Sequence, residues 1–120
     1  MKKHQIRKRY LQLRQEISAA DYKRFSAAMV TFFQQLSLPK CQRVLSYSAL
    51  TARNEFDPSP CIHTLQVLHP MLKIAWPRIK EDSGSMEALL LSPDTVYQPN
   101  AFGIMEPGSG EVLLPIQIDL

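Results

Sequence analysis

The sequence predicts an α/β protein with three layers, in which helices cover both faces of a mainly parallel, Rossmann-like sheet. Residues 1–37 carry apolar side chains at helical spacing, whereas short β-branched and aromatic runs recur from Arg43 onward. A helical stretch separates the first two of these runs, and a strand–helix–strand succession is typical of a parallel pair with a crossover. We expect one domain over residues 1–120, with the helices of 1–37 followed by a sheet region over 43–120.

Two amphipathic helices are predicted at the start of the chain. The first covers residues 2–17, where the apolar positions at helical spacing are Ile6, Tyr10, Leu13 and Ile17. The second covers residues 19–37, with Ser18 as its N-cap and Asp21 three residues further on. We expect its apolar stripe to be buried in the core. The stripe consists of Tyr22, Phe25, Met29, Phe32 and Leu36.

Short strands and turns are predicted for the rest of the chain. The expected elements are strands at 44–48, 72–76 and 86–91, a helix at 58–69 and a turn at 82–85. A further apolar strand of the sheet is expected to begin near Leu114. Because the sequence stops at Leu120, within that strand, we expect the C-terminal part of the sheet to be missing.

The composition indicates an ordinary globular protein, with 45% hydrophobic and 21% charged residues. No apolar run approaches the roughly 20 residues of a membrane span. The basic N-terminus is not followed by the apolar segment of a secretory signal, so a cytoplasmic protein is expected. Cys41 and Cys61 have no metal-type spacing and are expected to be reduced thiols, without a metal site.

Positive charge is concentrated at the N-terminus. Residues 1–24 hold eight Lys and Arg against two acidic residues, whereas residues 25–120 hold six bases and nine acids. A step of 100° per helical residue places Lys3, Arg7 and Arg14 within about 40° of each other. Several fixed cations in a row suit a polyphosphate. The alternatives are a solvated basic face and a loose nucleic-acid patch.

The segment Asn100–Pro107 has the composition of a ligand-binding loop. Gly103, between Phe102 and Ile104, indicates a backbone with positive φ or a close approach by another group. The proline after Glu106 favours an extended conformation for that residue. Such a mixture of apolar and polar side chains on a loop is typical of ligand sites. The alternative is a buried connection that Phe102 and Ile104 hold in place.

Polar side chains also follow the first two predicted strands. In open α/β sheets, ligands bind beyond the carboxyl ends of parallel strands, where Glu55 is expected. Asp57, directly before Pro58, suits the N-cap of the next helix, which leaves Glu55 for the ligand. Trp76, at the end of the second strand, is expected either to cap the core or to stack on a ligand.

Five short motifs along the chain have the order and spacing of those in a known family. They are Lys3-x-x-Ile6-Arg7-Lys8, Glu55-x-Asp57, Lys73 to Pro77, Asn100-x-Phe102-Gly103-Ile104-x-Glu106-Pro107, and Leu114-Pro115 through Leu120. Together they resemble the 5-formyltetrahydrofolate cyclo-ligase family (methenyltetrahydrofolate synthetase), and the match covers nearly the whole chain.

The resemblance implies an enzyme that uses ATP and Mg²⁺ to convert 5-formyltetrahydrofolate to 5,10-methenyltetrahydrofolate. In that reaction the formyl oxygen takes the γ-phosphoryl group, N10 attacks the activated carbon, and phosphate leaves. By resemblance, Lys3 and Arg7 would bind the ATP phosphates, and Glu55 would hold the folate near its reacting end. Phe102, Gly103 and Ile104 would shape the substrate pocket. Glu106 is a weaker candidate for the same pocket.

The chain also departs from the family pattern. Pro58 stands where the family usually has Thr, and the family continues with a glycine-rich loop and an acidic magnesium ligand. We therefore expect these 120 residues to be inactive by themselves. One alternative is a non-catalytic, truncated or degenerate copy that keeps part of the folate and ATP pocket. Another is a nucleic-acid-binding module; it has less support because Tyr10 is the only aromatic in the basic helix.

Overall fold

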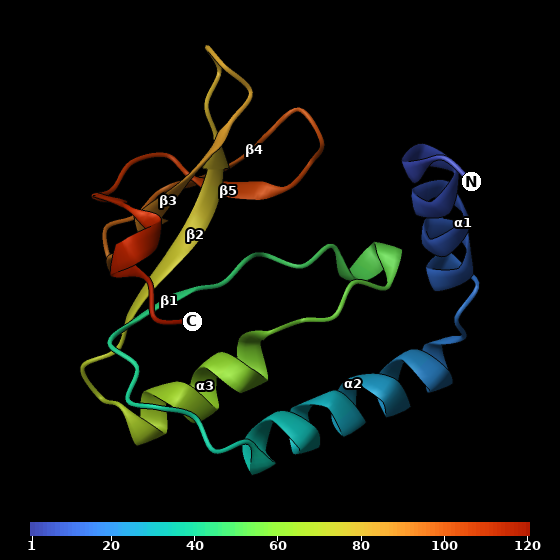
Figure 1. The fold of residues 1–120 in the computed structure, drawn as a ribbon, viewed down its shortest axis with the longest axis horizontal. Coiled ribbons are helices and arrows are strands. Elements are labelled where there is room, and N and C mark those ends of the chain that lie inside the picture. Colours follow the sequence, from blue (N-terminus) through green and yellow to red (C-terminus); the bar gives the residue numbers. More distant parts are fainter. The chain divides into compact units, whose positions relative to one another are not determined.

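The computed structural model describes all residues 1–120 and contains three α-helices, six short strands and two 3₁₀ helices (Figure 1). The chain forms two compact units. The first consists of residues 1–36 and 49–57, and the second of residues 37–48 and 58–120. None of the helices is long and apolar enough to cross a membrane.

The first unit contains both helices that were predicted for the N-terminal region. Helix α1 spans Lys3–Gln15 and α2 spans Ala19–Gln35. Ser18 caps α2 as expected, because its hydroxyl accepts a hydrogen bond of 3.1 Å from the backbone N–H of Asp21. A short 3₁₀ turn, η1 (Thr51–Arg53), belongs to the loop segment of the same unit.

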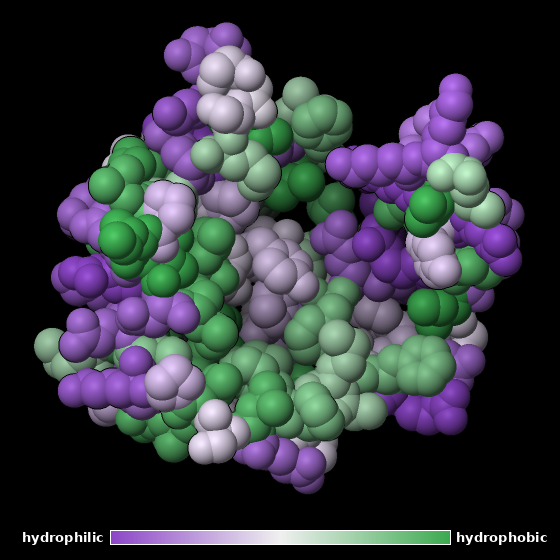
Figure 2. All heavy atoms as spheres, viewed as in Figure 1, coloured by the Kyte–Doolittle hydropathy of each residue, from purple (hydrophilic) through white to green (hydrophobic).

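The apolar stripe of α2 is exposed, so the expectation that it forms core is wrong for this chain. No residue of α2 is buried, and Figure 2 shows apolar side chains at the surface along this helix. Phe32 is 66% exposed and Met29 is 50% exposed. The periodicity correctly marked one face of α2 as apolar, but a periodicity does not indicate what covers that face.

The second unit contains a four-stranded sheet with the order β1-β2-β3-β6. Strand β1 (Arg43–Leu45) is parallel to β2 (Lys73–Ile79), and the crossover between them carries α3 (Ser59–Leu68). This pair confirms the predicted strand–helix–strand unit. Pro58 takes the N-cap position of α3, one residue later than Asp57.

The rest of the sheet is antiparallel, and the predicted three-layer, mainly parallel arrangement is not confirmed. Strand β3 (Met86–Leu90) is antiparallel to β2, and β6 (Val112–Leu113) is antiparallel to β3. A parallel return needs a crossover of about a dozen residues or more. The connection between β2 and β3 is a short turn, which allows only an antiparallel hairpin. The fold is a mixed α/β fold with a mostly antiparallel sheet.

The final segment differs from the single strand that was expected near Leu114. Strand β6 ends at Leu113, and a 3₁₀ helix, η2, follows at Pro115–Gln117 because Pro115 has no N–H for a ladder. Beyond η2, Asp119 N–H donates to Arg43 O at 2.9 Å, and Leu45 N–H donates to Leu120 O at 2.7 Å. The last two residues therefore run along the free edge of β1.

A second, two-stranded sheet holds the segment that the sequence marked as a ligand loop. Strands β4 (Tyr97–Pro99) and β5 (Met105–Pro107) form an antiparallel hairpin.

In the larger sheet, buried side chains of three strands form a core cluster on which Leu90 and Ile118 pack. The buried members are Ala75, Ala88 and Leu113. This cluster fixes β2 and β3, from which the hairpin site is built.

Candidate functional site

The side chain of Asn100 organises the loop between β4 and β5. Its Oδ1 accepts hydrogen bonds from the backbone N–H groups of Phe102 (2.9 Å) and Ile104 (3.1 Å). Gly103 has φ +78°, in the left-handed region where glycine carries no steric cost, which confirms the predicted positive φ. The loop is a tight turn that is closed on one amide side chain.

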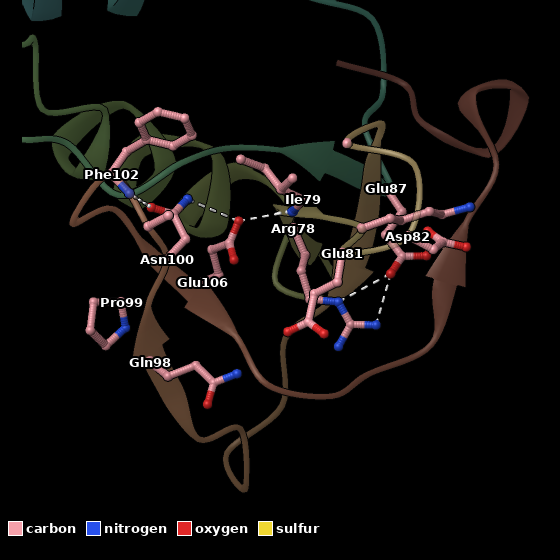
Figure 3. Close-up of a pocket in the computed structure, with 13 residues that line it drawn as sticks. Arg78, Ile79, Glu81, Asp82, Glu87, Gln98, Pro99, Asn100, Phe102 and Glu106 are labelled. Atoms are coloured by element: carbon pink, nitrogen blue, oxygen red, sulfur yellow. Dashed lines mark hydrogen bonds and ion pairs between the residues drawn. The ribbon is translucent and has the colours of Figure 1, made fainter.

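Glu106 connects this loop to the main sheet. Its Oε2 accepts from the backbone N–H of Ile79, the last residue of β2, at 2.8 Å and from Asn100 Nδ2 at 3.1 Å (Figure 3). The residue is only 9% exposed. Its other oxygen, Oε1, makes no hydrogen bond. Oε1 is not fully buried, since no fully buried side-chain oxygen lacks a partner, and Glu106 lines the adjacent pocket.

A pocket of about 870 Å³ lies between the hairpin loop, the end of β2 and the turn that follows it. Its wall includes Phe102, which is 66% exposed, and Glu106. Of the residues that the sequence suggested for the substrate, these two line the pocket. Gly103 and Ile104 do not line it; they form the turn that presents Phe102.

The charged residues on the β2 side of the pocket were given no role from the sequence. Arg78 forms an ion pair of 2.7 Å with Glu87 across the β2–β3 pair, and its Nη1 donates to Gly108 O at 2.9 Å. Lys80 also lines the pocket, and its side chain makes no ion pair. Both positions follow from the β2–β3 hairpin; the sequence predicted the turn at 82–85 but not the antiparallel direction of the two strands.

Trp76 packs inside the same unit. Its ring lies 5.1 Å from the ring of Tyr97, measured between centroids, at an interplanar angle of 53°. Trp76 is half-buried, and it does not line the pocket. This ring contact between β2 and β4 agrees with a core-capping role for Trp76. Trp76 is the one tryptophan of the chain, and it lies in the same unit as the pocket.

In the first unit, Glu55 is held by several contacts. Its Oε2 accepts from the backbone N–H of Leu50 at 2.9 Å, and its Oε1 lies 3.6 Å from Arg14 Nη2. Its backbone carbonyl accepts from the hydroxyl of Tyr22 at 2.7 Å. The side chain is 26% exposed.

Asn54 fixes the loop that carries Glu55 against the end of α1. It adopts a left-handed conformation with φ +55°, which asparagine tolerates better than most residues. Its Nδ2 donates to the carbonyls of Arg14 (3.0 Å) and Ile17 (3.1 Å). Asn54 thereby provides a donor to one carbonyl of the last turn of α1 and to one carbonyl of the linker that follows it.

The row of cations on α1 divides into two parts. Lys3 and Arg7 are exposed and make no hydrogen bond or ion pair through their side chains, so both cations are available to an anion. Arg14, placed on the same row from the sequence, instead donates from Nε to Arg53 O at 3.0 Å and pairs with Glu55. Arg14 therefore stabilises the Glu55 loop.

The chain contains no group of three or more His, Cys, Asp or Glu residues that could hold a metal ion. No ligand for Mg²⁺ is assigned among these residues. Cys41 and Cys61 are buried and unpaired. Burial raises the pKa of the Cys61 thiol.

The fold of this chain is similar to that of a solved folate enzyme, which superposes on nearly the whole chain. That structure is the NMR structure of 5,10-methenyltetrahydrofolate synthetase from Aquifex aeolicus, with a TM-score of 0.71 and 26% sequence identity. It matches 98% of this chain, and the chain spans 58% of the length of that protein. The family resemblance expected from the motifs is thus confirmed. No family model and no curated protein matches the sequence.

Proposed function

We propose that this chain provides the substrate-binding part of a 5-formyltetrahydrofolate cyclo-ligase, which forms 5,10-methenyltetrahydrofolate at the expense of ATP. The observation that carries the proposal is the superposition of 98% of the chain on a methenyltetrahydrofolate synthetase. The motifs at Lys3–Lys8, Glu55–Asp57 and Asn100–Pro107 support the same activity.

The pocket beside the hairpin loop suits the body of a folate. A folate carries flat aromatic rings and a glutamate tail with carboxylates. Phe102 offers an exposed ring on which a flat ring can stack. Lys80 lines the same pocket and forms no ion pair within 4.0 Å, so its ammonium group can contact a carboxylate of the tail. Glu106 Oε1 can accept a hydrogen bond from a ring N–H group.

In the first unit, Lys3 and Arg7 are the groups that we assign to the ATP phosphates, and Glu55 is the group that we assign to the reacting end of the folate. Two unpaired cations one helical turn apart can contact neighbouring phosphoryl groups. Arg14 holds Glu55 from one side through their 3.6 Å contact and is the positioning residue for it.

The reaction balances without a redox step. The formyl oxygen attacks the γ-phosphorus of ATP and ADP leaves. N10 then attacks the activated formyl carbon and loses its proton to solvent, and the former formyl oxygen departs as part of inorganic phosphate. Lys3 and Arg7 would orient the phosphates and offset their charge. We expect binding without turnover from residues 1–120 alone, because phosphoryl transfer needs a phosphate cradle and a metal together. Neither a glycine-rich phosphate loop nor a metal-binding cluster is present among these residues.

Titration with 5-formyltetrahydrofolate tests the proposal, with the fluorescence of Trp76 as the signal. We expect saturable quenching, and an affinity about five- to ten-fold lower in Phe102→Ala, the loss typical of one aromatic contact. Phe25→Ala is the matched control, because Phe25 is an exposed phenylalanine of α2 in the other unit. Unsaturable quenching, or equal losses in both variants, would contradict the proposal.

A further inference from the structure

A second pocket, of about 500 Å³, lies at the opposite end of β2 from the candidate folate pocket. Residues 40–43, at the start of β1, and residues 68–73, between α3 and β2, line it. Strand β2 has seven residues, so at about 3.3 Å per residue the two pockets are separated by roughly 20 Å. The second pocket is therefore a separate place on the same unit.

Its lining contains no acidic residue but several basic ones. Lys40, Arg43 and Lys73 are cations, and His69 adds an imidazole. The candidate folate pocket differs in composition, because four carboxylates line it beside Arg78 and Lys80. The carboxylates are Glu81, Asp82, Glu87 and Glu106. An anion is thus favoured at the amino ends of β1 and β2.

Two of these cations are neighbours in the sheet. Arg43 of β1 and Lys73 of β2 are directly paired in the parallel register, so their side chains leave the same face of the sheet. Like charges at paired positions destabilise a sheet. Neither side chain forms an ion pair within 4.0 Å. A bound anion would relieve this repulsion.

Two nearby features oppose an anion, but they are weaker than the cations. Asp119 Oδ2 accepts from the backbone N–H groups of Gln42 (2.8 Å) and Arg43 (2.9 Å), and its charge offsets one cation at most. The carboxyl end of α3 brings the equivalent of about half a negative charge. Three cations still leave the pocket net positive.

The rim of the pocket is apolar. Met71 is 88% exposed and Leu68 is 66% exposed, and both lie beside the basic side chains. A ligand that fills this pocket therefore combines an anionic head with an apolar body. The guanidinium of Arg43 favours a phosphoryl group, which it can bind through two parallel N–H···O contacts.

The geometry points to a second ligand site here, for a small phosphate ester whose phosphoryl group lies between Arg43 and Lys73 and whose apolar part rests on Leu68 and Met71. This site goes beyond the proposed cyclo-ligase function and does not depend on it. Inorganic pyrophosphate is the probe for the charged half of the site. Phenyl phosphate is the probe for both halves.

The experiment is an NMR titration of the full chain with each probe, in an Arg7→Ala background that weakens the phosphate contact proposed for α1. We expect saturable shifts at residues 40–43 and 68–73 with both probes. Lys73→Gln should raise both dissociation constants about ten-fold, as for loss of one hydrogen bond to a charged group. Met71→Ser should weaken phenyl phosphate alone.

Lys23→Gln is the matched control, because it removes one exposed lysine of α2 and leaves the pocket intact. Shifts that never saturate, or equal effects of Lys73→Gln and Lys23→Gln, would overturn the site and indicate general attraction to a basic chain. Dispersed amide spectra of each variant show that it is folded. Because the folate titration uses a different ligand and a different pocket, either proposal can fail without the other.

Discussion

Replacement of Asn100 by Ala tests whether this residue organises the pocket loop. The variant loses the acceptor for the N–H groups of Phe102 and Ile104 and the donor to Glu106. A neutral hydrogen bond contributes about 0.5–1.5 kcal/mol net, and one to a charged group about 1.5–3 kcal/mol. Water replaces part of this loss, because Phe102 is exposed. We therefore expect the free energy of unfolding to fall by about 2–3 kcal/mol.

Urea unfolding of the sheet unit, followed by the fluorescence of Trp76, measures this loss. Gln98→Ala is the control, because Gln98 lines the same pocket, is exposed and makes no hydrogen bond through its side chain. It should change the unfolding free energy by less than about 0.5 kcal/mol, as is usual for surface positions. The binding of 5-formyltetrahydrofolate should weaken in Asn100→Ala even at low temperature, where the variant is folded. Equal stability of the two variants would refute the organising role of Asn100.

Three further predictions concern the cations of α1, Glu55 and Asp119. Arg7→Ala should weaken ATP binding by about 1.5–3 kcal/mol in calorimetry, whereas Lys8→Ala, on another face of α1, should change it little. Equal effects of the two substitutions would show that the row of cations on α1 is a solvated patch. Glu55→Gln keeps an oxygen for the N–H of Leu50 and should lower folate affinity about ten-fold with little change in melting temperature; a lower melting temperature with unchanged affinity would make Glu55 purely structural. Hydrogen bonds from the backbone N–H groups of Gln42 and Arg43 hold the pKa of Asp119 below its ordinary value of 3.8. Because the folded-state pKa is the lower one, this stabilisation is present above about pH 4 and is lost as the pH falls further. Acid unfolding of Asp119→Asn should therefore depend less on pH than that of the unchanged chain, and identical profiles would contradict the assignment.

Local signals in the sequence predicted local structure well. Ser18 and Asp21 mark the start of α2 because a cap depends only on residues three apart. Gly103 indicated a positive φ because residues other than glycine avoid the left-handed region of backbone conformations. The parallel β1–β2 pair also followed from chain order alone, since two strands separated by a helix return in the same direction.

Features that depend on distant partners could not be predicted in the same way. The short link between β2 and β3 permits only a hairpin, whereas the strand order led us to predict a mainly parallel sheet. Arg14 lies in line with Lys3 and Arg7 on α1, and only the loop that carries Glu55 reveals its different role. The internal bonds of Asn100 and the Arg78–Glu87 pair likewise need three-dimensional neighbours that no spacing encodes.

The most direct test of the central claim is an amide NMR titration of the chain with 5-formyltetrahydrofolate. The claim is that the chain binds this substrate in the pocket formed by the hairpin loop and the end of β2. It predicts saturable shifts at residues 78–82 and 98–106, and weaker binding in Phe102→Ala. An absence of saturable shifts, or shifts confined to the pocket at residues 40–43 and 68–73, would contradict the claim.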